Sequence, residues 1–133
     1  TKNLMINAHD TIIGNGVTIF VPNGYVHIDG NAEVQLSAPV YSPDPKPAIP
    51  GVLFFLPPTN THELIINGNS ESYFQGTILA TGSEVDVEGN DVVDGYRTQI
   101  IAWDVEIGGT ANTFVLFDPS VLHSKPTTLE LFR

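Results

Sequence analysis

The sequence predicts an all-β protein, a single-stranded parallel β-helix (β-solenoid) of about four to five short coils. No stretch of the 133 residues has the apolar spacing of a helix, whereas short alternating runs bounded by Gly, Asn or Pro occur throughout. These runs recur with a period of about 20 residues, which is typical of solenoids. The length is that of a single domain.

Two series of strand-like motifs alternate along the chain. The glycines of the first series are 38, 21 and 20 residues apart, and the longest interval contains a proline-rich insertion. The first series, aliphatic-x-Gly followed by Asn or Thr, comprises Ile28–Asn31, Ile66–Asn69, Val87–Asn90 and Ile107–Thr110. The second series comprises Gly16–Phe20, Gly51–Phe55, Gly76–Ala80, Thr98–Ala102 and Thr113–Phe117.

Aligning the coils on the glycine of the first motif gives two aliphatic columns that are two residues apart. This spacing is expected for side chains that point inward from stacked strands. The columns are Val26, Leu64, Val85, Val105 and Ile28, Ile66, Val87, Ile107. A β-sandwich is the alternative fold; it would explain the strands but not the columns.

The residues after the motif glycine are expected to stack at one corner of the solenoid. Side-chain amides can hydrogen-bond along such a stack, and the preceding glycine permits a tight bend. The expected structural corner ladder consists of Asn31, Asn69, Asn90 and Thr110.

The single domain, residues 1–133, is expected to have three parts. Residues 1–13 form an N-terminal cap or strand, residues 14–117 the repeat body, and residues 118–133 a C-terminal tail. Residues 39–50 contain five prolines, which cannot donate to a strand ladder, so this insertion leaves the coil as a recognition loop or a tolerated surface excursion.

The composition excludes several classes of partner and site. Five Lys plus Arg against fifteen Asp plus Glu give a net charge of −10, which argues against binding to nucleic acid or an anionic membrane. The longest apolar run, 52–56, is far shorter than a membrane span of about 20 residues, so no direct membrane insertion is expected. The absence of cysteine removes disulfides and thiolate sites. The start at Thr1 suggests a trimmed or processed fragment.

The alignment also places carboxylates in two outward columns, Glu63–Glu84–Asp104 and Asp86–Glu106. Like charges on neighbouring strands destabilise a sheet. The columns are therefore either a solvated acidic face or a low-affinity Ca²⁺ site that an adjacent loop completes. The calcium hypothesis names Glu84, Asp86, Asp91, Asp94, Asp104 and Glu106 as ligands.

No sequence motif of a catalytic site is present, and we expect no catalytic residues and no enzyme. The four histidines have no metal-ligand spacing, and neither a Gly-x-Ser-x-Gly elbow nor a phosphate-binding loop with its lysine occurs. A polysaccharide-binding or polysaccharide-cleaving β-helix protein is the alternative. A cleaving enzyme of the lyase type would need a cation beside converging carboxylates, and Arg97 is the cation expected on the solenoid body.

The end of the chain, residues 127–132, alternates apolar and polar side chains outside the repeat. Solenoid ends expose open strand edges, so this segment is expected to cap its own solenoid or to pair with a neighbouring subunit. The candidate oligomer contacts are Leu129, Leu131 and Phe132.

A succession of motifs extends across residues 14–117: Val26–Ala32, Leu36–Pro39, Gly51–Phe55, Ile66–Ser70, Gly76–Ala80 and Gln99–Ala102. This succession resembles the C-terminal region of TadG-like proteins, which are associated with the bacterial Tad (Flp) pilus. The resemblance implies a right-handed coil, an extracellular or cell-surface location, and pilus or envelope proteins as partners. The chain departs from the family in lacking the membrane anchor helix, in its longer proline-rich insertion and in its additional C-terminal strand.

A looser similarity, of architecture alone, to bactofilin-like polymer-forming solenoids implies that the open ends could stack into filaments. Together these observations predict a non-catalytic extracellular structural or adhesive module. Its expected partners are further copies of itself or pilus and envelope proteins, with glycans as an additional candidate class.

Overall fold

The computed structural model is a parallel β-solenoid in which the described residues contain no helix. The structure describes residues 2–7, 9–40, 48–69, 71–89 and 96–109. Its strands are β1 (Leu4–Ile6), β2 (Thr11–Asn15), β3 (Ile19–Phe20), β4 (Val26–Ile28), β5 (Glu33–Ser37), β6 (Val52–Phe55), β7 (Leu64–Gly68), β8 (Tyr73–Gly89) and β9 (Tyr96–Gly108). The predicted fold class is confirmed.

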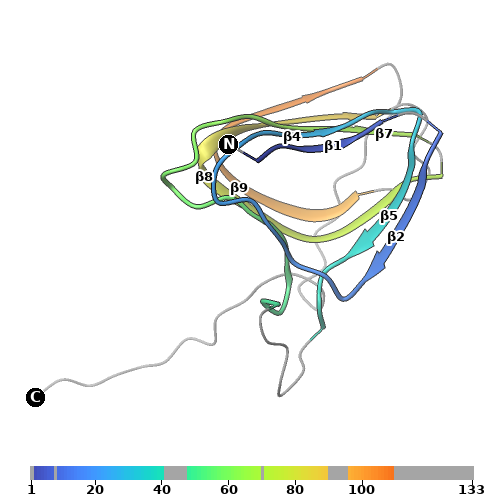
Figure 1. The fold of residues 1–133 in the computed structure, drawn as a ribbon, viewed down its shortest axis with the longest axis horizontal. Coiled ribbons are helices and arrows are strands. Elements are labelled where there is room, and N and C mark those ends of the chain that lie inside the picture. Colours follow the sequence, from blue (N-terminus) through green and yellow to red (C-terminus); the bar gives the residue numbers. More distant parts are fainter. Residues whose placement is uncertain (1, 8, 41–47, 70, 90–95, 110–133) are drawn as a thin grey trace, which may run out of the picture.

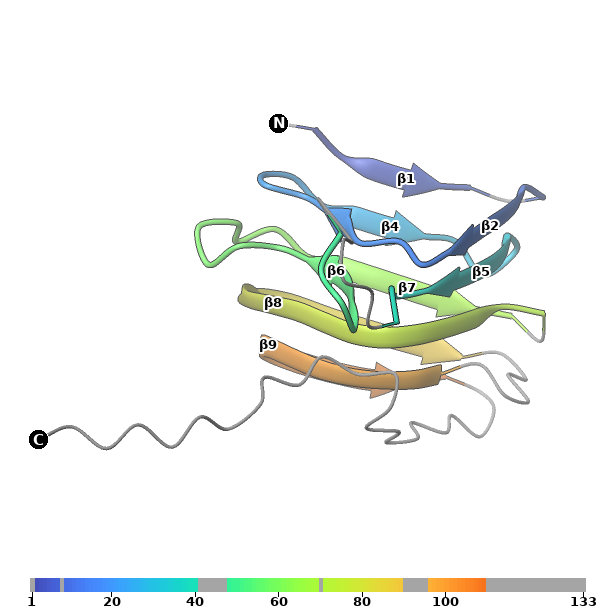
Figure 2. The same ribbon diagram turned by 90° about the horizontal axis from the view of Figure 1, so that it is seen from below.

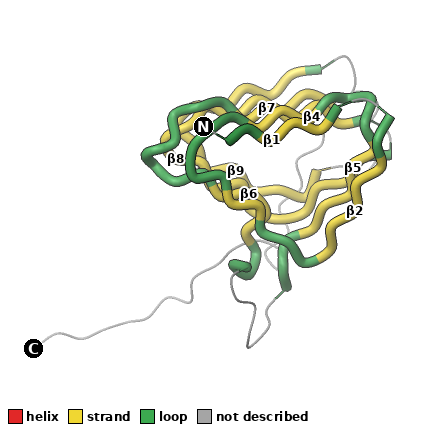
Figure 3. Tube along the Cα trace, viewed as in Figure 1, coloured by secondary structure: helices red, strands yellow, loops and turns green. Residues whose placement is uncertain are grey.

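The chain winds around a three-sided outline, with strands along the sides and loops at several of the corners (Figure 1, Figure 3). Every strand pairs in parallel with the equivalent strand of the next coil. In Figure 1 the chain runs clockwise, and Figure 2 shows the coils stacked in sequence order away from the N-terminus, so the solenoid is right-handed.

The three faces share the long strands β8 and β9, which each turn two corners. The first face consists of β1, β4, β7, the second half of β8 and the end of β9. The second face consists of β2, β5 and the first residues of β8 and β9. The third face consists of β3, β6 and the middle segments of β8 and β9.

The first face contains both aliphatic columns in the predicted register. Val26 pairs with Leu64, Leu64 with Val85, and Val85 with Val105. The column of Ile28 continues in the same way, and β1 adds one further row above each column. Val26, Leu64 and Val85 are fully buried, so these columns form the centre of the hydrophobic core.

The corner between the second and third faces depends on glycine. Gly16, Gly51 and Gly76 have φ values of 69°, 76° and 133°, a region that side chains with a Cβ rarely enter. A Cβ on Gly76 would lie 2.5 Å from Cβ of Ala38. Of the four glycines of the first motif, by contrast, only Gly109 has a positive φ. The tight bend that was expected after the first motif in every coil is therefore found mainly at the corner between the second and third faces.

The described ends of the proline-rich insertion lie side by side at the same corner. The Gly51 amide donates to the Pro39 carbonyl at 2.8 Å, and the Val52 amide donates to the Ile49 carbonyl at 3.0 Å. The chain therefore leaves the coil after β5 and returns at the start of β6, where the pairing with β8 shifts register between Val52 and Phe54.

A buried asparagine joins successive turns between the third and first faces. Asn60 is fully buried, and its amide group donates to the carbonyls of Val21 and Gly24, both at 3.0 Å. Its side-chain oxygen accepts from the His62 amide at 3.1 Å, and its own carbonyl accepts from Ser83 Oγ at 2.8 Å. One residue thus satisfies polar groups from three turns of the solenoid.

Replacing Asn60 with Ala is expected to lower the free energy of unfolding by about 2–3 kcal/mol, because two buried carbonyls lose their donor. Urea denaturation followed by circular dichroism measures the change. The matched control is Asn23→Ala, since the Asn23 side chain is exposed and its removal should change stability by less than about 0.5 kcal/mol. Equal effects of the two substitutions would contradict the assigned role of Asn60.

Candidate functional site

The carboxylates that the alignment of the coils placed in two columns lie together on the outward side of the first face. Glu84 pairs directly with Asp104, and Asp86 with Glu106, across the β8–β9 ladder. Glu63 lies one row above, immediately before β7. The described part of this face therefore has carboxylates on three neighbouring rows, and like charges at paired positions repel one another.

An aromatic and histidine cluster lies above the carboxylates on the same face. His27 Nε2 lies 2.8 Å from Glu63 Oε1, and the two side chains are 36% and 51% exposed. The Tyr25 ring packs on the His27 ring with centroids 4.4 Å apart, and the Tyr25 hydroxyl contacts Met5 Sδ at 3.3 Å. A protonated His27 would offset part of the charge of Glu63.

The sequence predicted no metal-ligand role for His27, and the pair that it forms with Glu63 was not predicted. The alignment of the coils contained the information needed to predict this pair. Val26 and Leu64 share a column, His27 follows Val26, and Glu63 precedes Leu64. The histidine and the glutamate are therefore diagonal neighbours on adjacent strands, within reach of long side chains.

A groove of about 230 Å³ lies between the first three rows of this face. Beside it are two buried side-chain oxygens without a hydrogen-bond partner, Asn67 Oδ1 in the groove wall and Asp86 Oδ1 on the next row. A buried acceptor that lacks a donor is costly to stability, and both oxygens are enclosed by neighbouring atoms. The lining residues are Met5, Asn7, His27, Ile28, Asp29, Ile65 and Asn67.

The carboxylate columns do not by themselves make a metal site. Among the described residues, no group of three or more His, Asp or Glu side chains is placed to hold a metal ion. Asp91 and Asp94, which the calcium hypothesis also names, lie outside the described residues. The calcium hypothesis therefore depends on a contribution from those loop residues and stays a prediction.

The corner predicted to hold a ladder of amides is stabilised in a different way. The Asn69 amide group donates to the Ala32 carbonyl of the preceding coil at 3.0 Å, whereas the Asn31 amide group donates to Asp29 Oδ1 of its own turn at 3.2 Å. The contact between coils is thus side chain to backbone rather than amide to amide. Asn90 and Thr110 of the predicted ladder lie outside the described residues.

Arg97, the cation of the lyase alternative, is not brought to this face. Arg97 pairs with Gln75 on the second face, away from the carboxylate columns of the first. Leu129, Leu131 and Phe132 lie outside the described residues.

In comparisons with protein families, curated proteins and solved structures, nothing matches this sequence. The resemblance to TadG-like proteins and to bactofilin-like solenoids therefore stays a hypothesis. Within the part of the chain that the structure describes, no helix is long and apolar enough to cross a membrane.

Replacing Glu106 with Lys is expected to raise the free energy of unfolding by about 0.5 kcal/mol, because a cation then faces Asp86 across the ladder. Thermal unfolding at low and at high salt measures the change, and the gain should shrink at high salt. The control is Glu71→Lys, which makes the same change of charge at an exposed position outside the columns. If both variants gain equally, net charge rather than the paired column is responsible.

Proposed function

We propose that this chain is a non-catalytic structural or adhesive module of a bacterial cell surface, pilus-associated or filament-forming, which assembles through the ends of its solenoid. The observation that carries the proposal is the pair of open ends. Within the described residues, β1, β2 and β3 each pair on one side, and β9 pairs with β8 alone. Strand edges of this kind readily accept another chain.

Among the described residues, apolar side chains of the core are also exposed at these ends. Val105 and Ile107 belong to the inward columns, yet they are 42% and 51% exposed. At the other end, Leu4 and Ile12 are partly exposed although they pack against the core. A further coil at either end would bury these side chains, which favours stacking of copies.

The two ends are compatible with each other in register and charge. If β9 of one copy paired with β1 of the next in the same register, Val105 would stack on Leu4 and Glu106 would meet Met5 instead of another carboxylate. Such a contact joins two different surfaces of the same chain, so it does not close on itself and produces a filament. The cell-surface location in this proposal is supported by the resemblance to TadG-like proteins.

The assembly proposal predicts elongated particles that lengthen with protein concentration in electron microscopy and light scattering. Val105→Lys should abolish them, because it places a charge in the inward column at the junction. Thr61→Lys is the matched control, since it introduces the same charged side chain at an exposed loop position. This variant should assemble like the unchanged chain. Monodisperse monomers of the unchanged chain at every concentration would overturn end-to-end assembly.

Calcium provides a separate measurement on the same samples. If the carboxylate columns bind Ca²⁺ together with loop residues, its addition should raise the unfolding temperature, and a chelator should reverse the effect. An unfolding temperature that does not respond to Ca²⁺ would contradict the calcium hypothesis without affecting the assembly proposal.

Glycan binding is a second candidate function, and the groove on the first face favours it. Its wall carries the polar side chains of Asn7, Asp29 and Asn67, and the Tyr25 ring, which packs on His27 of the groove, offers an aromatic surface. The groove includes Met5 of the edge strand β1, so a glycan bound there would lie next to the proposed junction between copies.

Screening on a glycan array followed by saturation-transfer NMR tests this second function. Asn67→Leu should lower affinity for any glycan found by about tenfold or more, because it removes a polar side chain from the groove wall. Asn15→Leu, on the second face, should leave affinity unchanged. Binding that survives Asn67→Leu would assign the glycan to another surface.

A further inference from the structure

The outward side of the third face is apolar. Phe20 pairs with Phe55, Phe55 with Leu79, and Leu79 with Ile101, so the four side chains form one line across four strands. We call these four residues the apolar stripe. Phe20 and Ile101 are 57% and 42% exposed, and the rings of Phe20 and Phe55 stack with centroids 5.4 Å apart.

The stripe differs from the other outward surfaces of the solenoid. On the second face the outward Gln35 pairs with Tyr73 and the outward Gln75 with Ser37, and the first face carries carboxylates. On the third face, the residues before the stripe members point inward and are apolar as well, so the strands are apolar on both sides. Parallel strands of this composition are normally covered on both sides by other segments, and contiguous exposed apolar surface marks a contact.

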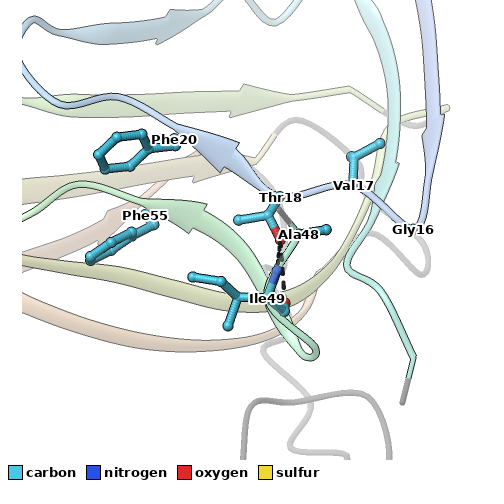
Figure 4. A pocket seen from close by; sticks show the side chains of 7 residues that line it. All are labelled: Gly16, Val17, Thr18, Phe20, Ala48, Ile49 and Phe55. Carbon is cyan, nitrogen blue, oxygen red and sulfur yellow. Dashed lines mark hydrogen bonds between the residues drawn. The ribbon is translucent and has the colours of Figure 1, made fainter. Parts of the chain in front are cut away.

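A groove of about 520 Å³ adjoins the stripe at the first two coils (Figure 4). Thr18 holds the shape of this groove. Its Oγ1 accepts a hydrogen bond from the Ile49 amide at 2.9 Å and donates one to the Val52 carbonyl at 2.8 Å. Among the described lining residues, the one hydroxyl is therefore already bonded, so this part of the groove suits an apolar group. The lining residues are Gly16, Val17, Thr18, Phe20, Ala48, Ile49 and Phe55.

We propose that the C-terminal tail of the same chain, residues 118–133, packs across the apolar stripe with Leu129, Leu131 and Phe132 as its contacts. Residues 110–133 lie outside the described residues. Leu129 and Leu131 alternate with polar residues and thus provide one apolar edge in an extended chain. Phe132 adds an aromatic ring of the kind that the groove beside Phe20 and Phe55 can accept.

The length of the tail is sufficient. The stripe crosses four neighbouring strands, so its ends are about 14 Å apart at the usual strand spacing. Sixteen extended residues span about 50 Å, and the chain before the tail has already reached the last described coil. The tail can therefore follow the stripe from Ile101 back to Phe20.

Charge favours the chain's own tail over the face of a second copy. Asp118 and Glu130 balance Lys125 and Arg133, so the tail is neutral and the other 117 residues carry the entire net charge of −10. Two copies packed stripe against stripe would bring two strongly acidic bodies together, whereas the tail adds no net charge. This contact is independent of assembly through the solenoid ends.

The absence of cysteine in the chain allows a direct test by cross-linking in dilute protein. Thr81 is exposed and lies two residues beyond Leu79 on β8, on the same outward side. In the double variant Thr81→Cys/Thr127→Cys, a short bis-maleimide should form an intramolecular cross-link, identified by intact mass and peptide mapping. The control pairs Thr127→Cys with Thr11→Cys on the exposed second face, and it should cross-link about tenfold more slowly because the effective concentration is lower.

A second variant separates docking from mere tethering. Adding Leu129→Ser, Leu131→Ser and Phe132→Ser to the first pair should reduce its cross-linking rate to that of the control, without loss of the solenoid's circular dichroism signal. Equal rates for the two cysteine pairs, or no effect of the serine changes, would overturn the proposal. Cross-linked dimers whose yield rises with concentration would also overturn it and assign the stripe to a second copy.

Discussion

The parallel register of the two aliphatic columns on the first face is the constraint on which the rest of this solenoid depends. Val26, Leu64 and Val85 are fully buried one above another, and neighbouring strands are about 4.8 Å apart. A slip of one residue would turn these side chains outward and bring the adjacent carboxylates into the core. The inward columns therefore also determine where every outward charge lies.

This register survives although the coils differ in length. The interval from Val26 to Leu64 is 38 residues, and the next interval is 21. The extra residues lie at corners, where the Gly51 amide closes the proline-rich insertion and Asn60 satisfies carbonyls of earlier turns. Because the additional chain is accommodated in loops, the strands keep their spacing, and the buried polar groups of the loops keep their partners.

The three faces have a common interior but different exteriors, and this division separates the activities that the chain could combine. The first face presents carboxylates and a groove with unpartnered oxygens, and the third presents the apolar stripe. The ends present open strand edges. A solenoid can thus use its ends for assembly and its faces for recognition or for covering by its own tail, since each surface faces a different direction.

The sequence by itself determined the periodic part of this protein. Both aliphatic columns and the carboxylate pairs Glu84–Asp104 and Asp86–Glu106 could be predicted, because stacking makes residues about one coil apart equivalent. Only the tertiary structure decided the contacts that depend on a unique loop path. Asn60 reaches carbonyls 39 and 36 residues away, a separation that no repeat encodes. The same holds for the groove beside the apolar stripe, which exists because the insertion returns to Thr18 and holds Ile49 there.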